Sequence, residues 1–326
     1  MMRDFINILV TSVGRRNLLL EYLKKELGDE GKVISTDCNK LAPALYVSDK
    51  HYIVPKINKP NYIEVIKDIC QKEDISAIFS LIDPELSLLA KHRDELKAIG
   101  VTSILSSYDA CQLWLDKYEV ANFCYKNGFN YAKTYDSLND FEIALENNEI
   151  QFPVFIKPRK GSASLNINKA ENIREAELIF NSSEDMIIQE FLEGQELGID
   201  VYVDTISKEV ISIFIKEKTA MRAGETDKAK SIKFDYVFKM IEDLISNAGL
   251  IGPVDVDVFR VDGEYYVSEI NPRFGGGYPL AYECGCNFPK YIINNLKGIV
   301  NEPQIGNYDE NIYMMKHDIL TIQKNL

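Results

Sequence analysis

The chain has 326 residues, of which 46% are hydrophobic, and it has no apolar stretch long enough to cross a bilayer. Its formal net charge of -13 argues against partners such as nucleic acid or an anionic membrane, because both require basic patches. The six cysteines form no Cys-x-x-Cys pair, so neither a zinc site nor a redox motif is expected. The apolar run at the N-terminus is too short for a signal peptide, which predicts a globular, cytoplasmic protein of two or three subdomains.

The first hundred or so residues alternate apolar strands with amphipathic helices, which predicts an open parallel sheet. Strands are expected at residues 6–12, 32–37, 51–55, 76–82 and 101–105. The first turn, TSVGRRN, lacks the Gly-x-Gly-x-x-Gly fingerprint of a dinucleotide site, so a nicotinamide-dependent dehydrogenase is disfavoured. The helix start at Gly14 and Arg15 is a candidate site for a substrate anion, and it fits a solvated basic helix start equally well. Asp83 precedes Pro84 as a helix N-cap would.

After Ser107 the pattern changes to a helix at residues 116–128 and then to strands with short connections. This change predicts a second, α+β unit with antiparallel strands. The segment from Lys218 to Ser231 is polar and has no apolar period, so we expect a mobile or substrate-facing loop there.

The segment VDVDVFRVDGEYYVSEINPR predicts a β-hairpin that turns at Asp262-Gly263. Turn length decides which side chains share a face. A two-residue loop would pair Asp257 with Ser268 and direct Asp257 away from Glu269. We therefore predict a three-residue loop, from residue 261 to residue 263, which places Asp257 and Glu269 on one face.

Glu269 and Asn271 stand two apart in the second strand, so their side chains project from the same face. Together with Asp257 they supply two carboxylates and an amide oxygen, a donor set that suits Mg²⁺ held jointly with phosphate oxygens. Arg273 follows and is a candidate to neutralise the same phosphates. An alternating Val-Asp strand is more often half-solvated than a metal site, but the Glu-x-Asn-Pro-Arg run favours the site. The glycines at 275–277 permit close approach to a ligand.

Five motifs of the chain occur in the order that they take in ATP-grasp enzymes. They are Lys117 in DKY, Lys157 in FPVFIKP, the loop GSAS, the strand end QEFLEG, and the cluster of Asp257, Glu269, Asn271 and Arg273. Over nearly its whole length the chain resembles that superfamily, and in particular one synthetase unit of the carbamoyl phosphate synthase large subunit and similar stand-alone carboxylate-amine ligases.

The resemblance implies a mixed fold, α/β followed by α+β. Residues 1–107 would form a Rossmann-like, parallel-sheet pre-ATP-grasp domain, and residues 108–326 a two-lobed ATP-grasp domain. Within the latter, residues 108–195 would be the small lobe that covers the nucleotide, and residues 196–326 the C-terminal lobe that holds metal and substrate.

The resemblance also implies roles for individual residues. Lys117 and Lys157 would contact ATP phosphates, and the loop containing Gly161, Ser162 and Ser164 would fold over them. The adenine edge would be bound by Glu190 and the Leu192 backbone, and the ribose by Glu196. The metal, Mg²⁺ with Mn²⁺ as the alternative, would be held by Asp257, Glu269 and Asn271. Arg273 and Arg222 would stabilise charge during catalysis.

The implied function is an ATP-dependent carboxylate-amine ligase that forms an acyl phosphate and releases ADP and phosphate. Its partners would be a small-molecule carboxylate and an amine, and the chain could also form a homodimer. Two alternatives remain at this point. One is an enzyme that phosphorylates bicarbonate and uses ammonia, as carbamoyl phosphate synthase does. The other is a nucleotide-binding regulatory module without turnover.

Overall fold

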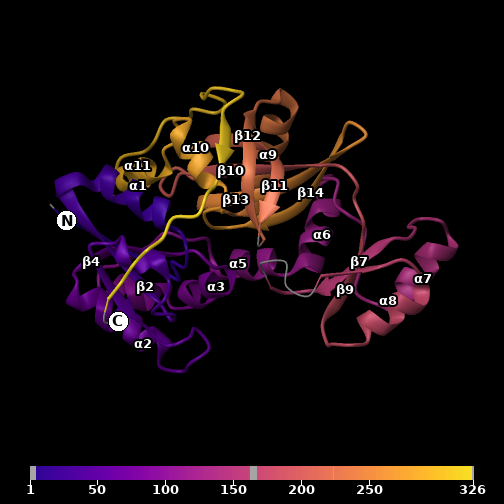
Figure 1. Cartoon of the computed structure of the whole chain (residues 1–326), viewed down its shortest axis with the longest axis horizontal. Coiled ribbons are helices and arrows are strands. Elements are labelled where there is room, and N and C mark those ends of the chain that lie inside the picture. Colours follow the sequence, from indigo (N-terminus) through magenta and orange to yellow (C-terminus); the bar gives the residue numbers. More distant parts are fainter. Residues whose placement is uncertain (1–4, 162–166, 223, 325–326) are drawn as a thin grey trace.

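A computed structural model describes residues 5–161, 167–222 and 224–324 of the chain. Three sheets follow one another along the sequence (Figure 1). The N-terminal sheet lies at one end of the molecule, and the lobe that carries α7 (Leu138–Glu146) and α8 (Ile173–Phe180) lies at the other. In the described ranges, no helix has the length and apolar character needed to span a membrane.

The N-terminal sheet has five parallel strands in the order β3-β2-β1-β4-β5. Ile8 and Val10 pack in one core with α1, whereas Leu9 packs in another with α2 and α3, so both faces of the central strand are covered. This burial accounts for the continuous apolar runs of the sequence. The elements are β1 (Ile6–Thr11), α1 (Asn17–Leu27), η1 (Gly28–Glu30), β2 (Gly31–Asp37), η2 (Pro43–Tyr46), β3 (Lys50–Ile53), α2 (Tyr62–Lys72), β4 (Ile75–Ser80), α3 (Asp83–Lys91), α4 (Arg93–Ala98) and β5 (Thr102–Ser103).

A small lobe follows, built on a four-stranded sheet in the order β6-β9-β7-β8. Its strands pair antiparallel, and Phe141 of α7 and Ala176 of α8 pack on Val154 and Ile156 of β7. The helices that lead into this lobe are α5 (Tyr108–Leu115) and α6 (Lys117–Lys126), and its strands are β6 (Thr134–Tyr135), β7 (Val154–Pro158), β8 (Asn168–Ala170) and β9 (Met186–Glu190).

The third sheet has six antiparallel strands in the order β14-β13-β10-β11-β12-β15. Leu197, Ile199 and Ile215 share a core with Val237 and Ile241 of α9, so one face of this sheet is apolar. The elements are β10 (Gln195–Val203), β11 (Val210–Arg222), β12 (Glu225–Ile232), α9 (Asp235–Ala248), β13 (Gly252–Val261), β14 (Glu264–Asn271), α10 (Tyr278–Glu283), α11 (Phe288–Leu296) and β15 (Tyr313–Met315). The expected order of a parallel-sheet domain followed by antiparallel sheets is confirmed.

The loop expected from Lys218 to Ser231 is wrong. Residues 218–222 extend β11 and residues 225–231 belong to β12, and the two strands pair antiparallel. Polar composition misled the prediction, because one face of this hairpin meets charged groups rather than an apolar core. The domain boundaries at 107 and 195 stay predictions.

The three-residue turn expected in the β13-β14 hairpin is also wrong, although the consequence drawn from it holds. Val261 pairs with Glu264, so the loop has two residues, and Asp262 and Gly263 have φ values of 49° and 89° as a type I′ turn requires. The register shifts between Asp257 and Val258, where Ser268 is the extra residue of a β-bulge. The bulge brings Asp257 opposite Glu269.

Candidate active site

A cavity of about 910 Å³ lies where the three sheets meet. Its walls come from the ends of β1 and β4, from the small lobe, and from the polar face of the six-stranded sheet. The cavity has two ends. The lysine end comprises Lys117, Lys157, Glu190, Leu192 and Glu196, and the arginine end comprises Arg16, Asp83, Glu225, Asp255 and Arg273.

At the lysine end, two half-buried lysines carry charge that few acids offset. The Lys117 ammonium donates to the Gly161 carbonyl at 2.6 Å, whereas Lys157 has neither a hydrogen bond nor an ion pair with any described residue. Burial lowers the pKa of Lys157 to about 8, a shift that Glu269 opposes and Lys117 reinforces. Burial also lowers the pKa of Lys117. Such under-neutralised cations favour an anionic ligand such as a phosphate chain.

The remainder of the lysine end has an apolar slot with polar groups at its edge. Phe155, Ile167, Leu192 and Phe259 contribute the apolar surface. The Glu190 carboxylate accepts the Lys133 backbone N–H at 3.1 Å, so it is held in place rather than free in solvent. A flat heterocycle with hydrogen-bonding edges suits this combination of surfaces.

The polar face of the six-stranded sheet carries the predicted metal ligands. Asp257 lies opposite Glu269 across β13 and β14, and Asp255 lies opposite Asn271. All four line the cavity. The predicted donors thus share one face, and their hard oxygen atoms suit Mg²⁺.

This donor set is too small to hold a metal ion without further ligands. Among the described residues, no three or more His, Cys, Asp or Glu side chains are arranged to hold a metal by themselves. Two carboxylates and one amide leave further coordination positions for phosphate oxygens. Burial raises the pKa of Asp257 to about 7, with Lys218 opposing the shift and neighbouring carboxylates adding to it. The excess of carboxylates around Asp257 fits a divalent cation.

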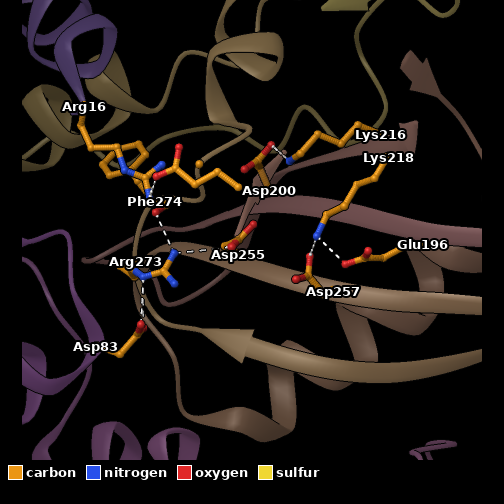
Figure 2. Close-up of polar contacts among 12 residues, drawn as sticks. Arg16, Asp83, Glu196, Asp200, Lys216, Lys218, Asp255, Asp257, Arg273 and Phe274 are labelled. Carbon is orange, nitrogen blue, oxygen red and sulfur yellow. Dashed lines mark hydrogen bonds and ion pairs between the residues drawn. The ribbon is translucent and has the colours of Figure 1, made fainter. Parts of the chain in front are cut away.

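Lys218 is paired with two of the acids in this region (Figure 2). Its Nζ lies 2.6 Å from Asp257 Oδ1 and 2.7 Å from Glu196 Oε1. Burial disfavours its charge, but these two carboxylates outweigh that effect and raise the pKa of Lys218. Lys218 therefore offsets the charge of these two acids and contacts Asp257 through Oδ1 alone.

Two residues away on the same face, Lys216 is sealed from the cavity. Its Nζ lies 2.5 Å from Asp200 Oδ2, and both side chains are only 1% exposed. Gly198 lies beneath the two lysine stems, because a Cβ atom there would come within 2.9 Å of the Cε atoms of both Lys216 and Lys218. The glycine is what lets both side chains cross β10.

At the arginine end, Arg273 joins the two halves of the molecule (Figure 2). Its Nε lies 3.1 Å from Asp83 Oδ1 in the N-terminal domain, and its Nη1 lies 3.5 Å from Asp255 Oδ2 on β13. Asp83 is thus not the helix cap that the sequence suggested, since Ile82 is the N-cap residue of α3 and makes no side-chain cap. Arg273 thus links the N-terminal domain to the polar face of the six-stranded sheet.

Arg16, at the N-cap position of α1, lines the same end. Its Nη2 lies 3.6 Å from Glu225 Oε1, and its guanidinium makes no hydrogen bond to any residue in the described ranges. The Glu225 carboxylate is shared with Lys316, 3.4 Å away. A Cβ at position 276 would lie 2.9 Å from Arg16 Nη1, so Gly276 allows the guanidinium to lie against the chain.

The structure thus brings most of the predicted site residues into one cavity. Lys117, Lys157, Gly161, Glu190, Leu192, Glu196, Asp257, Glu269, Asn271 and Arg273 all line it. Ser162 and Ser164 lie outside the described residues. Arg222 is not among the lining residues and instead forms ion pairs with Asp227 at 3.0 Å and Asp318 at 3.1 Å.

Sequence reasoning missed Lys218, Asp255 and Arg16. A period of two links Asp255 to Asp257 and Lys218 to Lys216, and this signal could have placed all four side chains on one face. It was obscured because residues 218–231 were interpreted as a loop. For Arg16 the helix start was recognised, but the preceding arginine was singled out.

Two family models match the chain. One is described as PylC-like, N-terminal domain and matches residues 8–104, and the other is the ATP-grasp domain, which matches residues 115–277. The second match covers half of the chain and contains almost all of the cavity residues named above.

Individual proteins agree with this result. The carbamoyl-phosphate synthase of Methanobrevibacter smithii is 26% identical, over 86% of this chain and 77% of its own length. The tyramine–L-glutamate ligase of Methanocaldococcus jannaschii is 24% identical, over 78% of this chain and 74% of its own length.

Among solved structures, the biotin carboxylase domain of the Hydrogenobacter thermophilus 2-oxoglutarate carboxylase, in complex with MgADP, superposes with a TM-score of 0.75. That likeness covers 95% of this chain and 74% of that chain at 17% identity, and it supports the fold. The chain belongs to the ATP-grasp family and is an ATP-grasp ligase, one of the enzymes that form carbon–nitrogen bonds and release ADP.

Proposed function

We propose that this ligase joins a small carboxylic acid to an amine at the expense of Mg-ATP, through an acyl phosphate. The observation that carries the proposal is one cavity with two differently charged ends. Its lysine end offers under-neutralised cations and an apolar slot, as a nucleotide requires, and its arginine end offers paired charges for polar substrates. A volume of about 910 Å³ is large enough for a nucleotide and a second small molecule.

In the first step a substrate carboxylate oxygen attacks the γ-phosphorus of ATP, and the bond from that phosphorus to the ADP oxygen breaks. Lys117 and Lys157 would hold the phosphate chain, and Arg273 would offset charge on the transferring group. When bound at Asp257, Glu269 and Asn271, Mg²⁺ would supply Lewis-acid neutralisation of the phosphate oxygens. Arg222 stays a sequence-based prediction for this role, and Arg222→Ala tests it.

In the second step the amine nitrogen attacks the acyl carbon, the carbon–nitrogen bond forms, and phosphate leaves. An acyl phosphate hydrolyses if water reaches it, so turnover requires that the cavity exclude water while the intermediate exists. Arg273, with its Asp83 ion pair, keeps the N-terminal domain against the catalytic face while the intermediate exists.

The test is phosphate release from Mg-ATP with a panel of small carboxylates and amino acids, added singly and then in pairs. Nucleotide products are resolved as ADP or AMP, and the condensation product is identified by mass. We expect ADP release that depends on an acid–amine pair, and none from Glu269→Gln protein purified in parallel. AMP formation, or turnover without an amine, would contradict the proposal.

Carbamoyl phosphate formation is the second candidate, because the Methanobrevibacter smithii relative covers most of this chain. It predicts ADP release with bicarbonate and ammonia alone, and carbamoyl phosphate as the product. The homodimer and the cytoplasmic location stay predictions from sequence.

A further inference from the structure

We propose that the amine substrate is an α-amino acid, whose carboxylate binds Arg16 and whose amino group binds Asp255. The inference rests on the ligase function proposed above and names the class of its amine substrate. It starts from two charged side chains of the arginine end whose interactions inside the protein are incomplete.

Arg16 is the incomplete cation. Its side chain is only 20% exposed, yet its sole partner within the described ranges is Glu225 at 3.6 Å. A guanidinium has five N–H donors in a planar fork that matches a carboxylate. An enclosed arginine with free donors that lines a cavity is a site for a substrate anion.

Arg16 is separated from the predicted metal site by the order of the strands. It pairs with Glu225 on β12, whereas Glu269 is on β14, and three strands lie between β12 and β14 in the sheet. The anion that Arg16 binds is therefore a different group from the carboxylate that reacts at the metal site, and the reaction leaves it intact.

Asp255 is the incomplete anion. Its contact with Arg273 is long, at 3.5 Å, and it lines the cavity. On β13 it stands two residues from Asp257, a separation of about 7 Å along a strand. An amine held at Asp255 is thus next to the place where the acyl phosphate would form, on the side of Arg16.

The glycine run connects the two groups. A Cβ at Gly275 would lie 2.3 Å from Asp255 Oδ1, and one at Gly276 would lie 2.9 Å from Arg16 Nη1. The carboxylate and the guanidinium therefore rest on adjacent glycines of one wall of the cavity. Two opposite charges that border the same part of the cavity suit the two charged ends of one α-amino acid.

Charge balance separates an amino acid from other anions. Asp83, Glu225 and Asp255 would repel a phosphate or a dicarboxylate, and Arg16 and Arg273 would repel a simple amine. A zwitterion satisfies both signs at once, because each of its charges faces an opposite charge.

This placement sets the amine nitrogen beside the acyl carbon for the second step. The nitrogen attacks the acyl carbon, the C–N bond forms and the C–O bond to phosphate breaks. Of the two protons that the ammonium group loses, one passes to solvent and the other leaves with phosphate.

Binding to MgADP-loaded protein tests the inference without turnover. Isothermal titration calorimetry is run with the twenty common amino acids and their D-enantiomers, and each hit is compared with its α-carboxamide, which keeps the amine and lacks the carboxylate charge. We expect at least one amino acid to bind, and its carboxamide to bind roughly 10- to 100-fold more weakly. Arg16→Gln should weaken the amino acid by a similar factor and leave the carboxamide unchanged.

Arg174→Gln is the matched control, because Arg174 is exposed on α8 and does not line the cavity. Thermal melts of both variants show whether the fold is retained. The proposal is overturned if no amino acid binds, if acid and carboxamide bind equally, or if Arg16→Gln affects both alike. Amino-acid binding without pair-dependent ADP release would instead refute the ligase function.

Discussion

The two walls of the cavity carry buried lysines in opposite electrostatic states. On β7, Lys157 forms no ion pair with any described acid, and burial lowers its pKa to about 8. On β11, Lys218 is held by Asp257 and Glu196, and its pKa is raised. The β7 wall therefore favours an anion, whereas the charge of Lys218 on the β11 wall is already offset by two acids.

Lys216 extends the comparison to a lysine with no access to the cavity. It has the same residue type and faces the same side of the same strand as Lys218, yet its pair with Asp200 is sealed. Access to the cavity, rather than residue type or pairing, distinguishes Lys218 from Lys216.

The largest effect is expected at Glu269, the carboxylate that lies between the two walls. Glu269→Gln should lower turnover by at least roughly 1,000-fold, because a metal ligand that stabilises the transferring phosphoryl group is worth several kcal/mol. Steady-state ADP release measures the loss, and circular dichroism with a thermal melt checks that the fold is intact. Near-normal activity in this variant would remove the metal assignment.

The next effect concerns stability and separates Lys216 from Lys218. Lys216→Met should lower the free energy of unfolding by about 3–5 kcal/mol, because it leaves the Asp200 carboxylate buried and unpaired. Urea denaturation followed by tryptophan fluorescence measures it. Lys218→Met is the matched variant and should cost less, since its acids line the cavity and reach water. Equal losses in the two variants would erase the distinction.

Nucleotide affinity separates Lys157 from Lys218. Lys157→Met should weaken ADP binding by roughly 30- to 100-fold, because it removes an unpaired cation from the predicted phosphate site. Lys218→Met should weaken it less, since two carboxylates already offset the charge of Lys218. Calorimetric titration of ADP gives both values, and a larger loss for Lys218→Met would reverse the roles of the walls.

The smallest effect is on pH dependence. Burial lowers the pKa of Lys157 to about 8, so ADP should bind several-fold more tightly at pH 7 than at pH 9 in the absence of metal. Lys157→Arg keeps its charge throughout this range and should flatten the profile. A wild-type profile that is already flat would show that the ammonium does not contact the phosphates.

The sequence predicts the large elements of this fold well, because buried parallel strands and amphipathic helices leave strong periodic patterns. It also predicts most of the cavity residues, since the motifs occur in a recognisable order. Residues 218–231 were misassigned because hydrophobicity is the signal used to find strands. This hairpin instead faces charged groups, which leave no such signal.

Pairing across domains lies beyond a single sequence. Arg273 is 190 residues from Asp83 along the chain, and nothing local to either residue indicates that they meet. The same holds for Arg16 and Glu225. Local rules predicted that Asp83 caps a helix. In the folded chain its carboxylate instead forms an ion pair with Arg273, which belongs to another domain.

The bulge at Ser268 separates the geometry of the hairpin tip from that of the catalytic face. A two-residue turn alone would direct Asp257 and Glu269 to opposite sides, and the additional residue corrects the alternation before the acids are reached. Natural or engineered changes at Asp262-Gly263 therefore leave the pairing of the two acids intact, provided that the number of residues from the bulge to Glu269 does not change. Deletion of Ser268, by contrast, would move one acid out of the site without changing either acid.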